Sequence, residues 1–355
     1  EKDWQQILIL KEMIKSNNMK IRIETISTKR ELDGFPYSSR NIHLSSEERK
    51  KMQLFSQELE NVKEDYKKNK NLDLKKILLN LKRMNISIDY LEHVNAFDLQ
   101  KTKNSDNITM LAGAILFNKA RLIDHVFLMK RKPIITVDGP AGSGKSTVTK
   151  ILAKELNLLY LDTGAMYRAL SWFLIKEKIN FRNNFELKES LKNISIIFQN
   201  NSQNEQNVFI NDYCVTNKIR SPEISSIVSS IASIKEVRKF LVAEQRKIGT
   251  SGGLVAEGRD TGTKVFPDSE LKIFLTASID ERALRRKLEL EQKGYGEIKF
   301  NELKNEIIKR DFDDSNRPIS PLIKAKDAIE IITDGYSIKE IVQKIIIIYN
   351  DKMPK

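Results

Sequence analysis

The sequence has a single cysteine, Cys214, and no long hydrophobic run. One cysteine cannot form a disulfide within the chain, which favours a protein of the reducing cytoplasm. The longest purely apolar run covers residues 345–348 with Tyr349 behind it and is far too short to span a bilayer, so no membrane partner is expected. No signal peptide is visible. The chain opens E-K-D-W-Q-Q without a methionine, and we expect it to come from the interior of a longer protein.

Histidine is scarce as well. The three histidines, His43, His93 and His125, lie far apart and form no H-x-x-H cluster, so we interpret them as structural and expect no zinc site. The N-K-x-D motif that reads guanine in regulatory GTPases is also missing, because the N-K pairs at 69, 118 and 217 are followed by N-L, A-R and I-R. This absence excludes a regulatory GTPase.

Positive charge is in excess, with 61 Lys and Arg against 48 Asp and Glu and a formal net charge of +13. Such a balance raises the question of a nucleic-acid partner. However, the lysines are scattered among acidic residues, as in residues 67–76, and no array of aromatic and basic residues stands out. Solvated surfaces account for most such runs, and binding of small polyanions such as ATP accounts for part of the excess. We therefore expect no nucleic-acid partner.

The length of 355 residues and the 40% hydrophobic content indicate a globular chain of two or more domains. The best boundary is M-K-R-K-P at 129–133, which divides the chain into residues 1–129 and 130–355. Upstream, the pattern is mostly helical, with few glycines. Downstream, short β-branched runs alternate with amphipathic helices, which predicts an α/β fold with a parallel sheet covered on both faces. The predicted strands are 134–137, 158–161, 253–256, 271–275 and 328–333.

Two local patterns add detail to the second domain. Between about residues 190 and 220, two apolar segments around a polar Asn/Gln turn predict a small antiparallel insert. Near the C-terminus, Ser337 and Glu340 have the spacing of a capping box and predict the start of the last helix.

The segment D-G-P-A-G-S-G-K-S-T at 138–147 contains the pattern G-x-x-x-x-G-K-[ST] between a predicted strand and a predicted helix. Its glycines let backbone N–H groups turn inward, and the helix N-terminus adds positive charge, which makes an anion site. Lys145 is expected to reach the β- and γ-phosphates of ATP, and Ser146 is expected to join a Mg²⁺ shell. The predicted ATP-binding residues are Gly139, Pro140, Ala141, Gly142, Ser143, Gly144, Lys145, Ser146 and Thr147.

Four further segments carry arginines just after predicted strands or on the helices that follow them. Open α/β sheets bind ligands at the carboxyl edge of their strands, so these segments predict a second anion site facing the first. That arrangement is typical of a kinase that acts on a small phosphorylated acceptor. The residues that stand out are Thr163 and Arg168 in 162–170, Arg259 and Asp260 in 257–263, Arg282, Arg285 and Arg286 in 281–287, and Arg310, Asp314 and Arg317 in 309–318.

From Pro133 to the C-terminus the chain resembles bacterial cytidylate kinase. The likeness is carried by G-P-A-G-S-G-K-S-T, L-D-T-G-A-M-Y-R, I-R-S-P-E-I-S (219–225), A-E-G-R-D-T-G-T-K-V-F-P-D (256–268) and R-P-I-S-P-L. It implies a P-loop kinase with a nucleotide-binding insert and a lid, which phosphorylates CMP or dCMP with ATP. It further implies a cytosine pocket of Thr163, Ser229, Arg238 and Asp260, pentose contacts from Arg310 and Asp314, and an acceptor-phosphate site of Arg168, Arg259 and Arg317.

Such a reaction needs no general base, because the acceptor phosphate is already ionised at neutral pH. The enzyme instead aligns the two substrates and neutralises the charge on the transferring oxygens. The residues expected to do so are Lys145, Arg168, Arg259, Arg317, Arg282 and Arg286.

The first 129 residues resemble the C-terminal portion of pantothenate synthetase, or pantoate–β-alanine ligase, a small α+β domain. The likeness lies in K-D-W-Q-Q (2–6), R-E-L-D-G-F-P-Y-S-S-R-N (30–41), L-S-S-E-E-R, D-Y-L-E-H-V and A-R-L-I-D. It implies condensation of pantoate with β-alanine through a pantoyl-adenylate. The residues implied for ATP and the adenylate are Lys2, Asp3, Ser38, Ser39 and Arg40, with Gln6 on pantoate. Together, the two resemblances describe a fusion of the two families.

The H-x-G-H signature of that ligase family does not occur in these 355 residues. We therefore expect this chain alone to form no pantothenate, and the complete gene product to form it. The alternative is a kinase of another nucleoside monophosphate whose N-terminal module is only structural. The sequence also leaves open whether the ligase half forms a homodimer.

Overall fold

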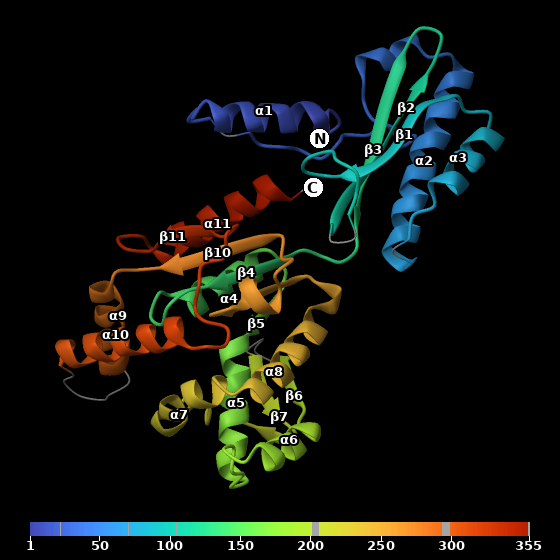
Figure 1. Cartoon of the computed structure of the whole chain (residues 1–355). Coiled ribbons are helices and arrows are strands. Elements are labelled where there is room, and N and C mark those ends of the chain that lie inside the picture. Colours follow the sequence, from blue (N-terminus) through green and yellow to red (C-terminus); the bar gives the residue numbers. More distant parts are fainter. Residues whose placement is uncertain (22, 70, 104–105, 201–205, 293–298, 354–355) are drawn as a thin grey trace. The chain divides into compact units, whose positions relative to one another are not determined.

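The computed structural model describes residues 1–21, 23–69, 71–103, 106–200, 206–292 and 299–353. The chain divides into two compact units, one of residues 1–132 with 347–355 and one of residues 133–346 (Figure 1). Among the described helices, none has the length and apolar character needed to cross a membrane.

Unit 1 is an α+β domain built on a three-stranded antiparallel sheet, in the order β1-β2-β3. In Figure 1, α2 and α3 lie together along the sheet. The core forms where Phe55 and Leu59 of α2 and Leu81 of α3 meet Leu111 and Ile115 of β2. The elements of unit 1 are α1 (Trp4–Ser16), η1 (Ser39–His43), α2 (Ser46–Asn69), α3 (Leu74–Arg83), β1 (Ile88–Asn95), β2 (Ile108–Leu116) and β3 (Arg121–Met129).

The mostly helical pattern predicted for this part of the chain was wrong between residues 88 and 129. Strand β2 is a nearly continuous apolar run, and periodicity cannot distinguish such a run from a buried helical segment. Strand β3 has polar residues at Arg121, Asp124 and His125 but no strict alternation that would mark it as a strand. A glycine helps to place the helix on this sheet. A Cβ at Gly113 would lie 2.8 Å from the Phe55 ring, so only glycine lets α2 pack this closely on β2.

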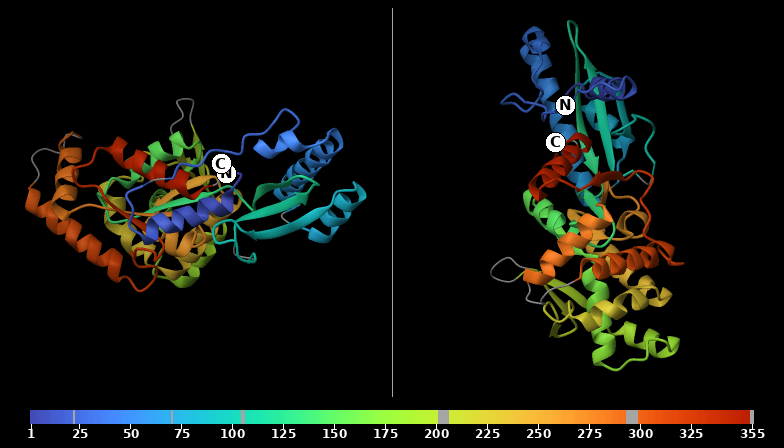
Figure 2. Two further views of the ribbon diagram at one scale, coloured as in Figure 1. Left: turned by 90° about the horizontal axis from the view of Figure 1, so that it is seen from above. Right: turned by 90° about the vertical axis from the view of Figure 1, so that its left-hand side faces the viewer.

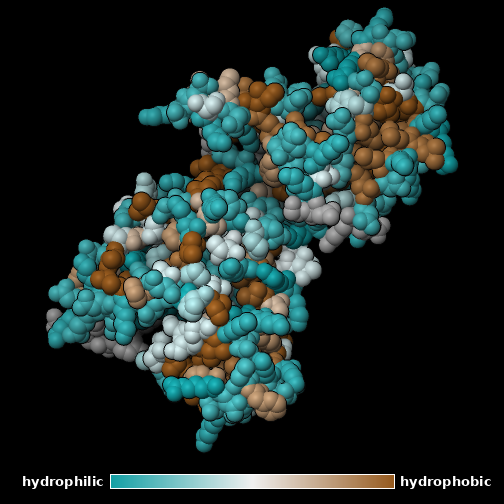
Figure 3. All heavy atoms as spheres, in the orientation of Figure 1, coloured by the Kyte–Doolittle hydropathy of each residue, from teal (hydrophilic) through white to brown (hydrophobic). Residues whose placement is uncertain are grey.

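The lysine-rich surface of α2 carries its own counter-charges. Lys63 lies 3.3 Å from Glu60 and Lys67 lies 2.5 Å from Glu64, each pair separated by less than one helical turn. Hydrophilic residues, coloured teal, cover much of the surface visible in Figure 3. These lysines are therefore part of a mixed, solvated helix surface.

Unit 2 is built on a five-stranded parallel sheet in the order β11-β10-β4-β9-β5, which confirms the predicted α/β fold. The strands β4 and β9 lie inside the sheet, and every residue in them is buried. This burial explains why their sequences read as short apolar runs. The strands are β4 (Ile134–Asp138), β5 (Leu159–Asp162), β9 (Leu254–Gly258), β10 (Leu271–Thr276) and β11 (Ile329–Ile332).

Helices connect these strands, as expected for parallel neighbours. The capping box predicted for the last helix is confirmed, since the Ser337 N–H donates to Glu340 Oε2 (2.8 Å) and the Glu340 N–H donates to Ser337 Oγ (3.3 Å). In Figures 1 and 2, α9 and α10 lie side by side, coloured orange. The helices are α4 (Lys145–Glu155), α5 (Thr163–Lys176), α8 (Lys235–Ile248), η2 (Gly249–Ser251), the π-helical η3 (Thr261–Val265), α9 (Ile279–Gln292), α10 (Phe300–Asn316) and α11 (Ile338–Lys352).

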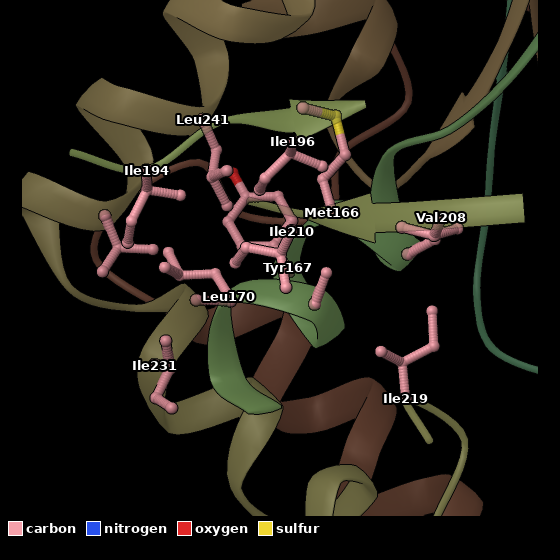
Figure 4. Packing of buried hydrophobic residues seen from close by; sticks show 14 of the residues in the cluster. Met166, Tyr167, Leu170, Ile194, Ile196, Val208, Ile210, Ile219, Ile231 and Leu241 are labelled. Atoms are coloured by element: carbon pink, nitrogen blue, oxygen red, sulfur yellow. The ribbon is translucent and has the colours of Figure 1, made fainter. Parts of the chain in front are cut away.

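The predicted antiparallel insert is confirmed as a second, three-stranded sheet in the order β6-β7-β8. Figure 4 shows Met166 and Leu170 of α5 packed among residues of this sheet and of α7 and α8. The polar turn predicted within the insert lies at 201–205, outside the described residues. The insert comprises α6 (Asn184–Lys192), β6 (Ile196–Asn200), β7 (Gln206–Ile210), β8 (Tyr213–Cys214) and α7 (Pro222–Ala232).

Candidate functional site

The glycine-rich loop lies between β4 and α4 and adopts a conformation that requires its glycines. Gly139, Gly142 and Gly144 have φ values of +151°, +76° and +83°, a region that other residues rarely adopt. A Cβ at Gly139 would lie 2.0 Å from the Leu275 carbonyl oxygen. Because Gly144 precedes α4 without a side-chain cap, the first N–H groups of the helix remain available to an anion.

Lys145, the first residue of α4, has a buried ammonium group. Its Nζ donates to the Pro140 carbonyl (2.6 Å) and to Ser143 Oγ (3.3 Å), both neutral acceptors. Burial, followed by the nearby Arg259, lowers the pKa of Lys145, whereas Glu257 opposes that shift. A phosphate would give this cation the charged partner that the loop does not supply, and charge-assisted hydrogen bonds are the stronger ones.

Glu257 lies near the end of β9, beside the same loop, and is 4% exposed. The Tyr160 hydroxyl donates to its Oε1 (2.6 Å), whereas its Oε2 is buried without a hydrogen-bond partner. Burial and the nearby Asp162 raise the pKa of Glu257, and hydrogen bonding from Tyr160 and Ser146 opposes this. Glu257 was not among the residues predicted from the sequence. It could have been found in the sequence as a carboxylate directly after an apolar predicted strand.

Asp138, the last residue of β4, joins the loop to a second segment of the site. It is buried, and burial raises its pKa. Its carboxylate accepts hydrogen bonds from the Thr261 N–H (2.9 Å), the Thr261 hydroxyl (2.7 Å) and the Gly262 N–H (2.8 Å). These bonds fix the start of η3 and thereby place the preceding Arg259 and Asp260 beside the loop.

Arginines and aspartates alternate in a cluster next to that segment. Asp260 pairs with Arg238, and its other oxygen lies 3.7 Å from Arg317. Asp314 accepts from Arg259 Nε (2.9 Å) and lies 3.8 Å from Arg317. The structure therefore brings together five of the residues predicted for the acceptor nucleotide.

Several donors around this cluster have no hydrogen-bond partner. They are Arg168 Nε, Arg238 Nε, Arg317 Nη2 and the Tyr167 hydroxyl, and all four atoms are buried. Burying a donor without an acceptor is costly. A bound phosphate or base edge offers the missing acceptors, so these atoms mark a place for an anionic, hydrogen-bonding ligand.

The other predicted acceptor residues have different environments. Thr163 begins α5 and donates from its hydroxyl to the Glu257 carbonyl (2.7 Å), while Arg168 one turn later donates to Asp162 (3.0 Å). Ser229 is exposed on α7. Arg310 on α10 is exposed to solvent but has many protein atoms around it. The resulting partial desolvation is the main cause that lowers the pKa of Arg310, and the positive charge of Arg259 lowers it further.

The arginines of α9 do not form one group. Arg282 is buried and donates to the Ala141 carbonyl in the glycine-rich loop (3.1 Å). Arg285 donates to Glu281 (2.9 Å) and to Thr333. Arg286 is exposed and pairs with Glu289 (2.9 Å). Arg282 therefore contacts the loop directly, whereas Arg286 lies at the surface in an ion pair with Glu289.

In unit 1, four of the residues predicted for the ligase, Lys2, Ser38, Ser39 and Arg40, lie at the η1 turn or contact the residue before it. Lys2 Nζ donates to the Tyr37 carbonyl (2.9 Å), and Ser38 Oγ accepts from the Arg40 N–H (3.3 Å). Burial lowers the pKa of Lys2, and the charges of Asp3 and Arg40 also act on it. Ser39 is exposed beside them, and Gln6 is exposed on α1. At η1 these residues offer one ammonium, one guanidinium and two hydroxyls, and Asp3 and Gln6 add a carboxylate and an amide at the start of α1.

Two of the three histidines, His93 and His125, lie in the sheet of unit 1 and contact their neighbours there. His125 is buried and packs edge-on against Phe127, and burial lowers its pKa to about 4. His93 Nε2 lies 2.8 Å from Thr109 Oγ1. His125 is thus a buried residue packed against an aromatic ring of β3, as expected for a structural histidine.

Two family models match the chain. The cytidylate kinase model matches residues 135–351, and the pantoate-beta-alanine ligase model matches residues 1–127. Among curated proteins, one from Prochlorococcus marinus subsp. pastoris is 65% identical over 355 residues, which cover 100% of this chain and 70% of the relative. One from Prochlorococcus marinus strain MIT 9312 is 63% identical with the same coverage. Both are named bifunctional pantoate ligase/cytidylate kinase.

Solved structures give a partial match. Pantothenate synthetase from Thermus thermophilus is 27% identical, and the match covers 36% of this chain and 47% of that chain with a TM-score of 0.32. The present chain thus spans about half of that structure.

Proposed function

Because the chain belongs to the cytidylate kinase family and, over its full length, to the bifunctional pantoate ligase/cytidylate kinases, we propose that unit 2 phosphorylates CMP and dCMP with ATP. The products are ADP and CDP or dCDP. The observation that carries this proposal is a glycine-rich anion loop with the buried Lys145 beside an Arg–Asp cluster whose donors lack partners.

In the proposed reaction, the loop N–H groups and Lys145 hold the ATP phosphates at the end of β4. Arg168, Arg259 and Arg317 hold the acceptor phosphate, and Arg238 with Asp260 reads the cytosine edge. Thr163 and Ser229 complete the base pocket, and Arg310 and Asp314 contact the pentose. The acceptor oxygen is already ionised, so these residues act by alignment and by neutralising the transferring charge.

Two side chains beside the loop offer oxygen ligands that suit a magnesium ion. Mg²⁺ prefers oxygen ligands, and the Ser146 hydroxyl lies beside the Glu257 carboxylate, whose buried Oε2 has no hydrogen-bond partner. We propose that Ser146 holds the ion and that Glu257 lies in its shell. When bound, Mg²⁺ would neutralise charge between the β- and γ-phosphates.

The Ser146→Ala variant should need a higher free Mg²⁺ concentration for half-maximal CMP phosphorylation, by about tenfold or more. The hydroxyl is the part of the side chain that matters, so Ser146→Thr should restore the requirement of the original chain. Initial rates measured against free Mg²⁺ test this. An unchanged Mg²⁺ dependence in Ser146→Ala would remove Ser146 from the site.

The relatives are named as bifunctional, and residues 1–127 match the ligase model. We propose that unit 1 contributes part of the ligase site and does not form pantothenate by itself. We propose that Lys2, Asp3, Ser38, Ser39 and Arg40 hold ATP phosphates and the pantoyl-adenylate and that Gln6 binds pantoate, which then condenses with β-alanine. We propose the division of the two activities at residues 129 and 130. We further propose that the ligase half forms a homodimer and that the protein is cytoplasmic.

The test of the kinase assignment is CMP-dependent release of ADP from ATP. CMP and dCMP should both stimulate ADP release strongly above the rate without acceptor. If AMP or GMP stimulates ADP release more than CMP does, the assignment of the acceptor pocket to cytosine is wrong.

A further inference from the structure

The buried guanidinium of Arg282 joins three separate parts of unit 2. Its Nε donates to the Ala277 carbonyl just after β10 (3.1 Å), and its Nη1 donates to the Ala141 carbonyl in the glycine-rich loop (3.1 Å). Its Nη2 lies 2.7 Å from Asp311 Oδ2 on α10. With the side chain only 4% exposed and each nitrogen engaged, Arg282 is a fixed connection between the loop and α10.

Helix α10 carries acceptor-site residues on either side of Asp311 in the sequence. Arg310 precedes it, and Asp314 follows one turn later and accepts from Arg259 (2.9 Å). A helix moves as a stiff body over one turn, since its backbone hydrogen bonds join residues four apart. The position of Asp311 therefore sets the position of Asp314.

One oxygen of Asp311 is buried without a hydrogen-bond partner. A carboxylate placed only for stability is expected to have both oxygens satisfied, because an unsatisfied buried acceptor is costly. This half-satisfied carboxylate fits a role in holding Arg282 rather than in packing.

We propose that Asp311 is a positioning residue that couples the two nucleotide sites through Arg282. Binding of ATP phosphates to the loop fixes the Ala141 carbonyl, Arg282 carries that constraint to Asp311, and α10 presents Arg310 and Asp314 in the geometry that CMP requires. By thermodynamic linkage, each nucleotide then raises the affinity for the other by the same factor. This inference rests on the proposed CMP kinase function.

The experiment measures the Kd of CMP by calorimetry, with and without a saturating nonhydrolysable ATP analogue and Mg²⁺. In the unaltered chain, the analogue should tighten CMP binding about fivefold or more, which is the usual range of coupling between sites. In Asp311→Asn, which keeps the side-chain shape and removes the charge, this factor should fall to near one. The Kd of CMP alone should change little.

The matched control is Asp280→Asn. Asp280 and Lys304 form another ion pair between α9 and α10, with 2.5 Å between Lys304 Nζ and Asp280 Oδ1, and the pair does not involve Arg282 or Asp311. Its removal should leave the coupling factor unchanged. If Asp311→Asn does not fold, Arg282→Lys serves instead, because a lysine keeps the charge but cannot hold all three partners.

The inference is overturned if the unaltered chain shows no coupling, if Asp311→Asn retains it, or if Asp280→Asn loses it equally. CMP turnover by the unaltered chain is measured first. Failure of that turnover would count against the kinase assignment, whereas normal turnover with uncoupled binding would count against the role of Asp311 alone.

Discussion

The Lys145→Ala variant should phosphorylate CMP at least about 10²-fold more slowly than the unaltered chain and should still be folded. Loss of one positioned, charge-stabilising group typically costs this much in rate. The fold should survive because Lys145 has only neutral hydrogen-bond acceptors, the Pro140 carbonyl and Ser143 Oγ. No carboxylate loses a direct hydrogen bond when Lys145 is removed.

Steady-state rates at saturating ATP and CMP, together with circular dichroism, test this expectation. Lys154→Ala is the matched control, since Lys154 lies on the same helix in its last turn and is exposed. Near-normal turnover by a folded Lys145→Ala variant would contradict the assignment of the loop.

The Arg238→Met variant should lose discrimination between CMP and UMP by about 10- to 100-fold while its KM for ATP stays nearly constant. A hydrogen bond to a charged group is worth about 1.5–3 kcal/mol, which corresponds to that range. Arg238 is buried, pairs with Asp260 and has an Nε without a partner, as expected for a residue that reads a base edge.

This variant also removes the main partner of a buried carboxylate, and breaking such a pair is typically destabilising. The double variant Arg238→Met/Asp260→Asn therefore serves as the control, because it removes the unpaired charge as well. Relative kcat/KM for CMP and UMP is the measurement. A rise in KM for ATP with unchanged selection between CMP and UMP would place Arg238 in the donor site.

The phosphate loop and the parallel sheet could be predicted from the sequence because each has a strong local signature. Strands β4 and β9 are short apolar runs between turn residues, and the motif from Gly139 to Ser146 requires a strand–loop–helix context. The sheet of unit 1 could not be predicted from periodicity. Its β2 and β3 have no regular alternation of polar residues, and the partner strands that stabilise them are distant in the sequence.

The site could be predicted as a set of residue types but not as a set of contacts. Arg282 and Arg286 are four residues apart and have the same chemistry, yet one is buried against the loop and the other pairs with Glu289 in solvent. That difference depends on α10, which follows later in the chain. Glu257 and Asp311 were missed for the same reason, since their importance comes from buried atoms that only the folded structure brings together.

The most direct test of the central claim is a competition among acceptors in one tube. Equal concentrations of CMP, UMP, AMP and GMP are incubated with limiting ATP, Mg²⁺ and the 355-residue chain, and the nucleoside diphosphates are separated and quantified. Every transfer converts ATP to ADP, whichever acceptor is used. The AMP therefore carries an isotopic label, so that ADP formed by phosphorylation of AMP can be distinguished. The account predicts CDP as the dominant product among the acceptors. Labelled ADP or GDP in excess of CDP would contradict it.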